Sequence, residues 1–264
     1  MSLHRTWKRP PFFKNPTLRW SLGVGAAIYL SLALGTMEVN WSRVAAGLPR
    51  AERFVMSFFP PDFVSRSGDI ADGMYESLWM TVVSTVIGIG LSIPVGLGAA
   101  RNLSPRPVYL FSRAVLALSR TFPEIIIALF AVKIFSFGPF AGIIALSVGS
   151  IGFYGKLLAE DIEDMDPVQA EAIKATGSSW FQWLNYAVQP QVMPRMIGLA
   201  MYRFDINFRE SAVLGIVGAG GIGATLLTSF DRYEFDSSAA ILLIIIAIVM
   251  AVEYSSSFIR KWVQ

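Results

Sequence analysis

The sequence has 264 residues, of which 54% are hydrophobic and 16% charged, and its mean hydropathy is +0.53. Soluble domains carry roughly 25% charged residues, so this composition excludes an ordinary soluble protein and predicts membrane spans. The net charge is +3, and the charged residues flank apolar segments, which argues against a nucleic-acid-binding face. No cysteine is present, which excludes disulfides and thiolate chemistry. The single histidine, His4, lies in a basic tail.

The first predicted span runs from Trp20 to Met37 and follows residues 1–19, which contain five Lys or Arg and no acidic residue. A signal peptide has similar flanks, but this apolar run is long and ends in no clear cleavage site. We therefore expect an uncleaved span with a cytoplasmic N-terminus. Residues 38–72 mix charged and aromatic side chains, and we expect an external segment with a short interfacial helix. Residues 1–72 thus form one predicted part of the chain.

The remaining residues, 73–264, form the predicted transmembrane core. Apolar runs predict five further spans, at residues 73–100, 108–135, 140–159, 193–218 and 238–259. Lys and Arg are concentrated in the loops that six spans would place inside, so we expect both termini in the cytoplasm. The glycine-rich stretch Gly218–Gly223 has no preceding strand, so a tight outer turn or re-entrant kink is favoured over a dinucleotide-binding loop. A polar outer loop is expected to follow it.

A polar segment, residues 160–192, interrupts the apolar pattern between the fourth and fifth predicted spans. Asp166 and the proline after it predict a helix start, and Gly177 predicts a helix stop. Two short helices are therefore expected, over residues 168–176 and 180–188, outside the bilayer. Two prolines, Pro190 and Pro194, are expected to lead into the next span.

This segment resembles the cytoplasmic motif E-A-A-x3-G-x9-I-x-L-P of permease subunits of ABC importers. Glu171, Ala172, Gly177 and Pro190 occupy matching positions, whereas Ile173 replaces the second alanine and the apolar tail of the motif is degenerate. The resemblance implies a coupling helix that docks in a groove of a separate ATPase subunit. The alternative is an amphipathic loop with a chance Glu-Ala pair. The implied coupling residues are Glu171, Ala172, Ile173, Ala175, Gly177 and Pro190.

Three more stretches look like the phosphonate-type (PhnE-like) permeases: residues 120–124, 152–161 and 209–223. With the coupling motif, the resemblance covers most of residues 74–259. It implies an all-α integral membrane protein with six transmembrane helices and the type I ABC importer (MetI-like) permease fold. It also implies transport of a small oxyanion, such as a phosphonate, phosphite or phosphate. Permeases for methionine or glycine betaine share parts of these patterns and remain an alternative.

Ionisable residues within the predicted spans need a partner or a water-filled path. Arg120 and Glu124 are four residues apart and can pair, and the same spacing joins Asp205 and Arg209. Such charges could stabilise the bundle or a gate, or they could form a basic path for an anion, since the arginine fork matches phosphate-like oxygens. The candidate residues for the path or gate are Arg120, Glu124, Arg203, Arg209 and Glu210.

The resemblance implies that this chain hydrolyses no ATP, and no phosphate-binding G-x-x-x-x-G-K-[ST] stretch occurs in it. ATP and Mg²⁺ are expected on the ATPase subunit, and no cofactor, metal or nucleic acid is expected here. One docking segment per chain predicts two ATPase subunits on two copies of this chain, a homodimer with the pore between the copies. The resemblance adds an extracytoplasmic solute-binding protein and a location in the lipid of the bacterial plasma (inner) membrane.

Two other classes of protein are open alternatives. A secondary transporter would show inverted repeats and a coupling-ion site near the bilayer midplane, and no convincing repeat is found. A membrane-embedded enzyme would need a nucleophile, metal ligands or paired carboxylates in a cavity, and the spacing of the acidic residues matches no such site.

Overall fold

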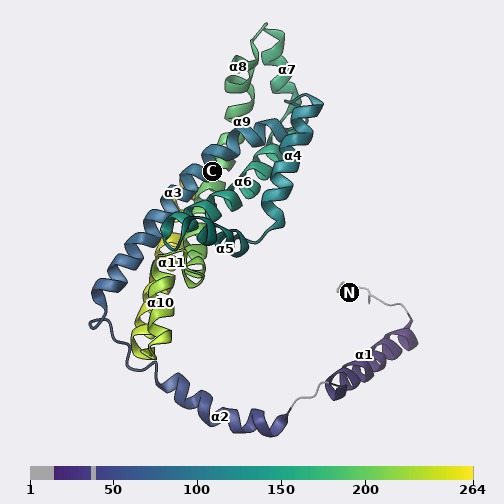
Figure 1. Ribbon diagram of the computed structural model, residues 1–264. Coiled ribbons are helices and arrows are strands. Elements are labelled where there is room, and N and C mark those ends of the chain that lie inside the picture. Colours follow the sequence, from purple (N-terminus) through teal and green to yellow (C-terminus); the bar gives the residue numbers. More distant parts are fainter. Residues whose placement is uncertain (1–14, 37–39, 264) are drawn as a thin grey trace, which may run out of the picture. The chain divides into compact units, whose positions relative to one another are not determined.

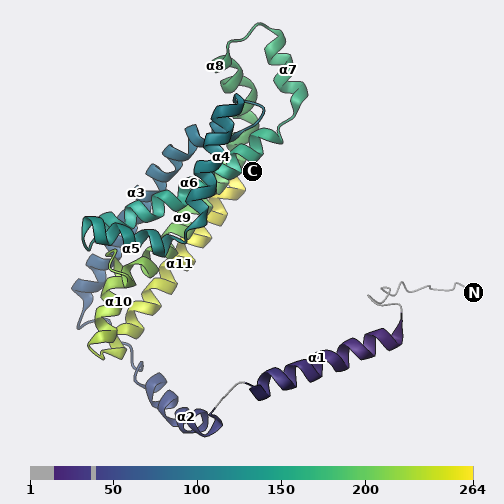
Figure 2. The same ribbon diagram turned by 45° about the vertical axis from the view of Figure 1, so that its right-hand side comes forward.

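The computed structural model describes residues 15–36 and 40–263, and within these ranges it contains helices and turns but no strand. The contacts divide the chain into two units, residues 1–55 and 56–264. Residues 1–14 of the predicted basic tail, including His4, lie outside the described residues, as does Met37, the last residue of the first predicted span. The two ribbon views in Figures 1 and 2 show both units.

The first unit contains α1 (Pro16–Thr36) and almost all of α2 (Trp41–Met56). Proline suits the first helical turn, and Asn15 accepts a hydrogen bond from the Thr17 N–H at 3.3 Å. With 21 residues, α1 is about 32 Å long, which is enough to cross the apolar part of a bilayer. The helix that we expected in the external segment is confirmed by α2.

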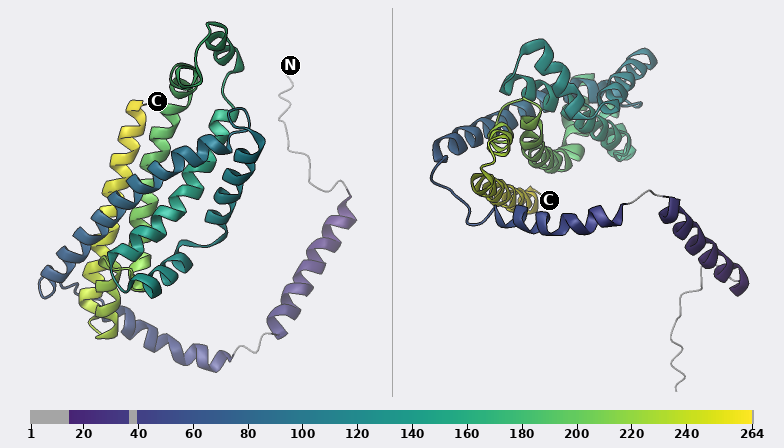
Figure 3. Two further views of the ribbon diagram at one scale, coloured as in Figure 1. Left: turned by 45° about the horizontal axis from the view of Figure 1, so that its top comes forward. Right: turned by 60° about the horizontal axis from the view of Figure 1, so that its bottom comes forward.

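The second unit is a bundle whose long helices α3, α6, α9 and α11 run side by side, as Figure 3 shows. At one end α7 and α8 project from the bundle, and at the other end lie α10 and the glycine-rich turn (Figures 1 and 3). Its helices are α3 (Ser67–Ala99), α4 (Arg106–Thr121), α5 (Glu124–Phe135), α6 (Pro139–Glu163), α7 (Pro167–Ala175), α8 (Trp180–Trp183), a π-helical turn (Leu184–Val188), α9 (Gln189–Ile216), α10 (Ile222–Asp231) and α11 (Phe235–Val263).

The most extensive contact between two helices is that of α3 with α6, which pack through small residues. A Cβ atom added at Gly96 would lie 2.9 Å from the carbonyl oxygen of Gly155, so only glycine lets the two backbones approach this closely. Ser92 strengthens the contact, because its hydroxyl donates to the carbonyl oxygens of Gly88 and Ser150. Small residues therefore hold the centre of the bundle, as is common between helices in membranes.

Four described helices are long and apolar enough to cross a membrane, namely α1, α3, α6 and α11, and the bent pair α4–α5 would be a fifth span. Of these, α3, α6 and α11 agree with the predicted spans at residues 73–100, 140–159 and 238–259 respectively. The predicted span 193–218 corresponds to α9. Its 28 residues are long enough to cross a membrane, but it is more polar than the four helices named above.

The third predicted span, residues 108–135, is wrong as a continuous helix. It breaks at Phe122 and Pro123, and α4 and α5 meet at an angle of 88°. Proline has no N–H and disfavours helical geometry in the residue before it, and Phe122 is accordingly extended (φ −100°, ψ 129°).

The tight turn expected at the glycine-rich stretch is confirmed. Gly218, Gly220 and Gly221 have φ values of +91°, +78° and +75°, which residues other than glycine rarely adopt. The polar loop expected after it is wrong in part, because α10 forms there. Glu76 accepts a hydrogen bond from the Gly221 N–H at 2.7 Å, and Ser77 accepts one from the Ile222 N–H at 2.9 Å. These contacts from α3 satisfy free N–H groups at the start of α10.

Candidate functional site

The α7–α8 segment, residues 164–188, contains the predicted coupling motif. The Asp166 carboxylate accepts a hydrogen bond from the Val168 N–H at 2.9 Å, which starts α7 at Pro167. Gly177 ends the turn after α7 with a φ of +81°. Ser179 and Gln182 then form a reciprocal capping box at the start of α8. The expected start and stop of the first short helix are therefore confirmed.

Trp183 fixes α8 against α7. Its indole N–H donates to the carbonyl oxygen of Ala170 at 2.9 Å, and the Lys174 ammonium lies 4.4 Å from the centre of its ring. Ala170 and Trp183 are buried in one apolar cluster, and Ile173 packs against that cluster. The two short helices thus form one packed element, held together by contacts between residues 9 to 13 positions apart.

The predicted coupling residues divide into two groups. Ile173 is half-buried and belongs to the packing between α7 and α8, so it supports the segment from within. The other five are exposed and available to a partner: Glu171, Ala172, Ala175, Gly177 and Pro190.

The second short helix of this segment differs from the prediction. We expected one short helix over residues 180–188, with Pro190 and Pro194 leading into the next span, but α8 ends at Trp183 and a π-helical turn leads directly into α9, which contains both prolines. The backbone N–H of Gln189 donates to the Leu184 carbonyl, five residues earlier. This wider turn precedes Pro190 in the first turn of α9, where its missing N–H costs little.

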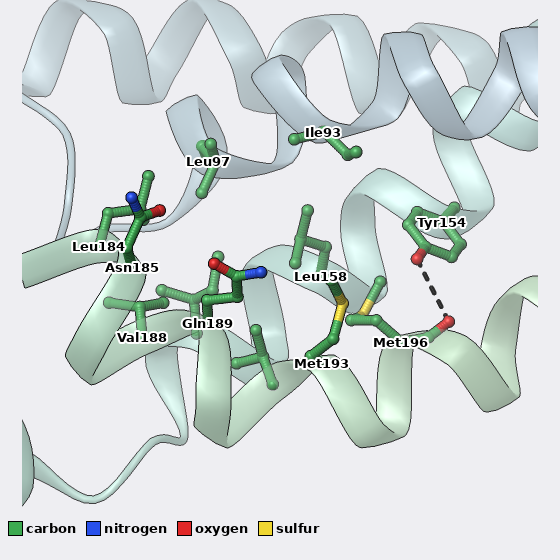
Figure 4. A pocket seen from close by; sticks show the side chains of 12 residues that line it. Ile93, Leu97, Tyr154, Leu158, Leu184, Asn185, Val188, Gln189, Met193 and Met196 are labelled. Atoms are coloured by element: carbon green, nitrogen blue, oxygen red, sulfur yellow. Dashed lines mark hydrogen bonds between the residues drawn. The ribbon is translucent and has the colours of Figure 1, made fainter. Parts of the chain in front are cut away.

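An apolar pocket of about 250 Å³ lies under the π-helical turn, between α3, α6 and the start of α9. Figure 4 shows Leu97, Leu158 and Met193 lining it, with the Tyr154 hydroxyl directed to the carbonyl oxygen of Met196 at 3.2 Å. Its remaining polar side chains are the amides of Asn185 and Gln189. No charged residue lines this pocket, so it does not provide the basic path considered for an anion.

Three of the predicted path residues meet inside the bundle. Arg203 of α9 is 3% exposed, and its Nη2 atom lies 3.4 Å from Glu124 Oε1 of α5 and 3.6 Å from Glu210 Oε2 of α9. Its Nε atom donates to the Ser150 hydroxyl at 2.9 Å. One cation therefore lies between two carboxylates, so Arg203 is already neutralised and is not free for an anion.

A polar network that was not predicted from the sequence surrounds this charged cluster. The Asn207 side-chain amide donates to Thr85 Oγ1 at 2.8 Å and to Ser150 Oγ at 3.2 Å, which links α3, α6 and α9. The Cζ atom of Arg203 also lies 5.6 Å from the centre of the Phe153 ring. Uncharged residues in apolar helices give little sequence signal, although their burial in a bundle requires such partners.

The other two predicted residues lie elsewhere. Arg209 pairs with Asp205, as their four-residue spacing predicted, and the Asp205 side chain is 6% exposed. The predicted pair of Arg120 and Glu124 is wrong, because the break at Pro123 separates them and Glu124 pairs with Arg203 instead.

Arg120 instead borders a second cavity, of about 330 Å³, on the α4–α6 face. Its other charged lining residues are Arg113 and Lys156, and Leu116 and Ala117 complete it. Arg113 lies 2.9 Å from Glu163, and Lys156 lies 3.3 Å from Glu160.

The guanidinium of Arg120 forms no ion pair or hydrogen bond with any residue in the described ranges 15–36 and 40–263. Its stem packs on Gly152, where an added Cβ atom would lie 2.6 Å from Arg120 Cγ. Lys156, which the sequence analysis did not assign to the path, lies one helical turn beyond Gly152. The cavity therefore has one positive charge in excess.

No group of three or more His, Asp or Glu side chains that could hold a metal ion occurs among the described residues. The chemistry that the two charged sites allow is electrostatic binding and ion-pair exchange.

Comparisons with known proteins agree on one family. Residues 92–264 match the family model described as binding-protein-dependent transport system inner membrane component. The chain is 44% identical over 203 residues to the phosphate-import permease protein PhnE of Mycolicibacterium smegmatis, covering 76% of this chain and 38% of that relative. It is 39% identical over 237 residues to the phosphite transport system permease protein PtxC of Stutzerimonas stutzeri, covering 89% and 84%.

The chain thus spans well under half the length of the mycobacterial relative. Among solved structures, an inward-facing form of the MetNI methionine ABC transporter matches with a TM-score of 0.66 and 25% identity, covering 74% of this chain and 96% of that one. This likeness confirms the expected all-helical permease fold.

Proposed function

Because the chain belongs to the family of binding-protein-dependent transport system inner membrane components, we propose that it forms the membrane path of an ATP-driven importer for a small oxyanion. The observation that carries the proposal is the cavity between α4 and α6 in which Arg120 has no described counter-charge. Arg120 is exposed in the single chain, and an unpaired guanidinium attracts an anion, whose two oxygens its planar fork can bind.

The relatives support a phosphorus oxyanion as the solute. Their names assign them to the transport of phosphate, phosphite and, in an Escherichia coli relative, phosphonate. These ions share a tetrahedral, negatively charged phosphorus group, which matches the excess positive charge beside Arg120. Which of them this chain carries is decided by measurement of uptake.

The exposed face of α7 supports coupling to a separate ATPase subunit. Glu171, Ala172 and Ala175 are exposed on a helix that Trp183 holds rigidly against α8. A rigid short helix passes on the motion of a partner as a lever, since its backbone hydrogen bonds are satisfied internally. In this proposal the partner binds ATP and Mg²⁺, and the chain itself performs no covalent chemistry.

The assembly proposed around the chain is a homodimer with two ATPase subunits and an extracytoplasmic solute-binding protein. Six spans in each copy, with α4–α5 as a bent span and α9 as the polar inner one, would place both termini in the cytoplasm of the bacterial inner membrane. In this arrangement residues 1–72 add a span and an external segment to a permease core of residues 73–264.

Uptake of radiolabelled phosphate and phosphite into cells that express the full importer tests the solute path. We expect Arg120→Gln to abolish uptake and Arg120→Lys to retain part of it, while the amount of assembled complex stays unchanged. Arg106→Gln, at the exposed start of the same helix, is the matched control and should transport normally. Normal uptake by Arg120→Gln would refute the path, and saturable uptake of methionine but of no phosphorus oxyanion would favour the methionine-type alternative.

A further inference from the structure

The helix α2 carries an apolar stripe and a basic stripe along its length, and we propose that it lies in the membrane surface and binds anionic phospholipid there. The apolar residues recur at spacings of three and four, which places them on one face of the helix. Their large members are well exposed, with Trp41 at 71% and Leu48 at 68%. The apolar stripe consists of Trp41, Val44, Leu48, Ala51 and Val55.

The basic stripe lies on the other side of the same helix and consists of Arg43, Arg50 and Arg53, with Ala46 between them. At 100° per residue these positions fall about 120° to 200° away from the centre of the apolar stripe. None of the three arginines forms an ion pair with a residue in the described part of the chain, and Glu52 is the one acidic residue within α2. The helix therefore presents a net positive face to anionic groups.

The chain keeps α2 close to the bilayer. Five residue steps separate Thr36, the end of α1, from Trp41, so the two can be at most about 18 Å apart. On the other side, Met56 is followed after ten residues by α3, a second helix long and apolar enough to span the membrane. A helix joined to a span at each end stays near the surface, where an apolar face can enter the acyl boundary.

Anionic phospholipid fits both stripes at once. Amphipathic helices with basic polar faces lie in the interface plane, with aromatic and aliphatic side chains in the acyl boundary and arginines among the headgroups. A protein partner on the apolar stripe would instead exclude lipid from Leu48. The proposal is independent of the solute that the importer carries, so it survives even if the oxyanion path is refuted.

The absence of cysteine makes a direct test possible, because each engineered cysteine is the single labelling site of the full-length chain. Leu48→Cys reports the apolar stripe and Ala46→Cys the basic stripe, and Leu91→Cys on α3, an exposed apolar position, serves as the lipid-facing reference. Each spin-labelled protein is placed in nanodiscs of phosphatidylcholine with or without phosphatidylglycerol. Accessibility to oxygen, which partitions into lipid, and to a water-soluble nickel chelate is then measured.

We expect the label at position 48 to resemble that at position 91, reached by oxygen and shielded from nickel, and the label at position 46 to show the reverse. Removing phosphatidylglycerol should shift the position-48 label toward water. R43Q/R50Q/R53Q should lose this lipid dependence, whereas R43K/R50K/R53K should keep it. An unchanged label at position 91 shows that the variants are folded.

Three outcomes would overturn the proposal. Labels at positions 46 and 48 that are equally open to nickel would place α2 in water. A label at position 48 shielded from both reagents would show that protein, either a second copy or another subunit, covers the apolar stripe. A dependence on phosphatidylglycerol that persists in the glutamine variant would show that the three arginines do not bind the headgroups.

Discussion

Arg203 of α9 and Glu124 of α5 are joined by an ion pair, with Nη2 and Oε1 3.4 Å apart, although 79 positions separate them in the sequence. Glu124 is the first residue of α5, directly after the break at Pro123. The pair therefore fixes the start of α5 against α9. This is the point at which a change in the bend between α4 and α5 would have to break a contact.

Loss of the Arg203 cation should destabilise the bundle. Arg203→Gln would leave Glu124 and Glu210 without the cation between them, and breaking a buried pair in this way costs about 3–5 kcal/mol. We expect a lower midpoint of thermal unfolding in detergent or lipid, and partial recovery in Arg203→Gln/Glu210→Gln, which removes one of the two charges. Equal stability of wild type and Arg203→Gln would contradict the role given to this cluster.

Arg209 should behave differently from Arg120. Its partner Asp205 is buried but Arg209 itself is half exposed, so Arg209→Gln is expected to lower stability through an uncompensated carboxylate, by less than the loss of the buried Arg203. Asp205→Asn in the same chain should restore most of the stability and of the uptake. Arg120→Gln has no such partner and should reduce uptake without loss of stability. Failure of Asp205→Asn to rescue Arg209→Gln would instead assign Arg209 a direct part in transport.

Trp183 should control the rigidity of the α7–α8 segment. Trp183→Phe preserves most of the apolar contact but leaves the Ala170 carbonyl without its donor, a loss of about 1–3 kcal/mol. We expect faster amide hydrogen exchange in α7 and weaker coupling of transport to ATP hydrolysis. Trp180→Phe is the matched control, since Trp180 is exposed. Unchanged exchange in α7 would show that other contacts hold the segment.

The exposed face of α7 should bind the ATPase subunit. Glu171→Arg reverses a charge on this face, and Gly177→Pro removes the positive φ that the turn requires. Both are expected to lower the amount of ATPase that co-purifies with the chain. Gln169→Arg, which adds the same charge on the other flank of α7, is the control. Equal co-purification of all three variants would count against the coupling role and would reopen the secondary-transporter alternative.

Local signals predicted much of the fold. Asp166, Gly177 and the glycines of the 218–223 turn act within a few residues of themselves, through free N–H groups and positive φ angles, so their effects are visible in the sequence. The apolar runs of α1, α3, α6 and α11 are likewise local properties. The break at Phe122 was missed although Pro123 is visible, because mean hydropathy carries no information about a missing N–H.

The partners of the charged residues depended on the bundle. Spacing along one helix predicted the pair of Asp205 and Arg209, but it also predicted the incorrect pair of Arg120 and Glu124. Only packing brings Arg203 between Glu124 and Glu210 and leaves Arg120 with an excess charge beside Lys156. The sequence by itself determined that the chain enters the membrane and carries a capped polar helical segment, since hydrophobicity and helix caps act locally. The tertiary structure decided which charges are neutralised, because an ion pair depends on distance in space and Glu124 reaches Arg203 from a different helix.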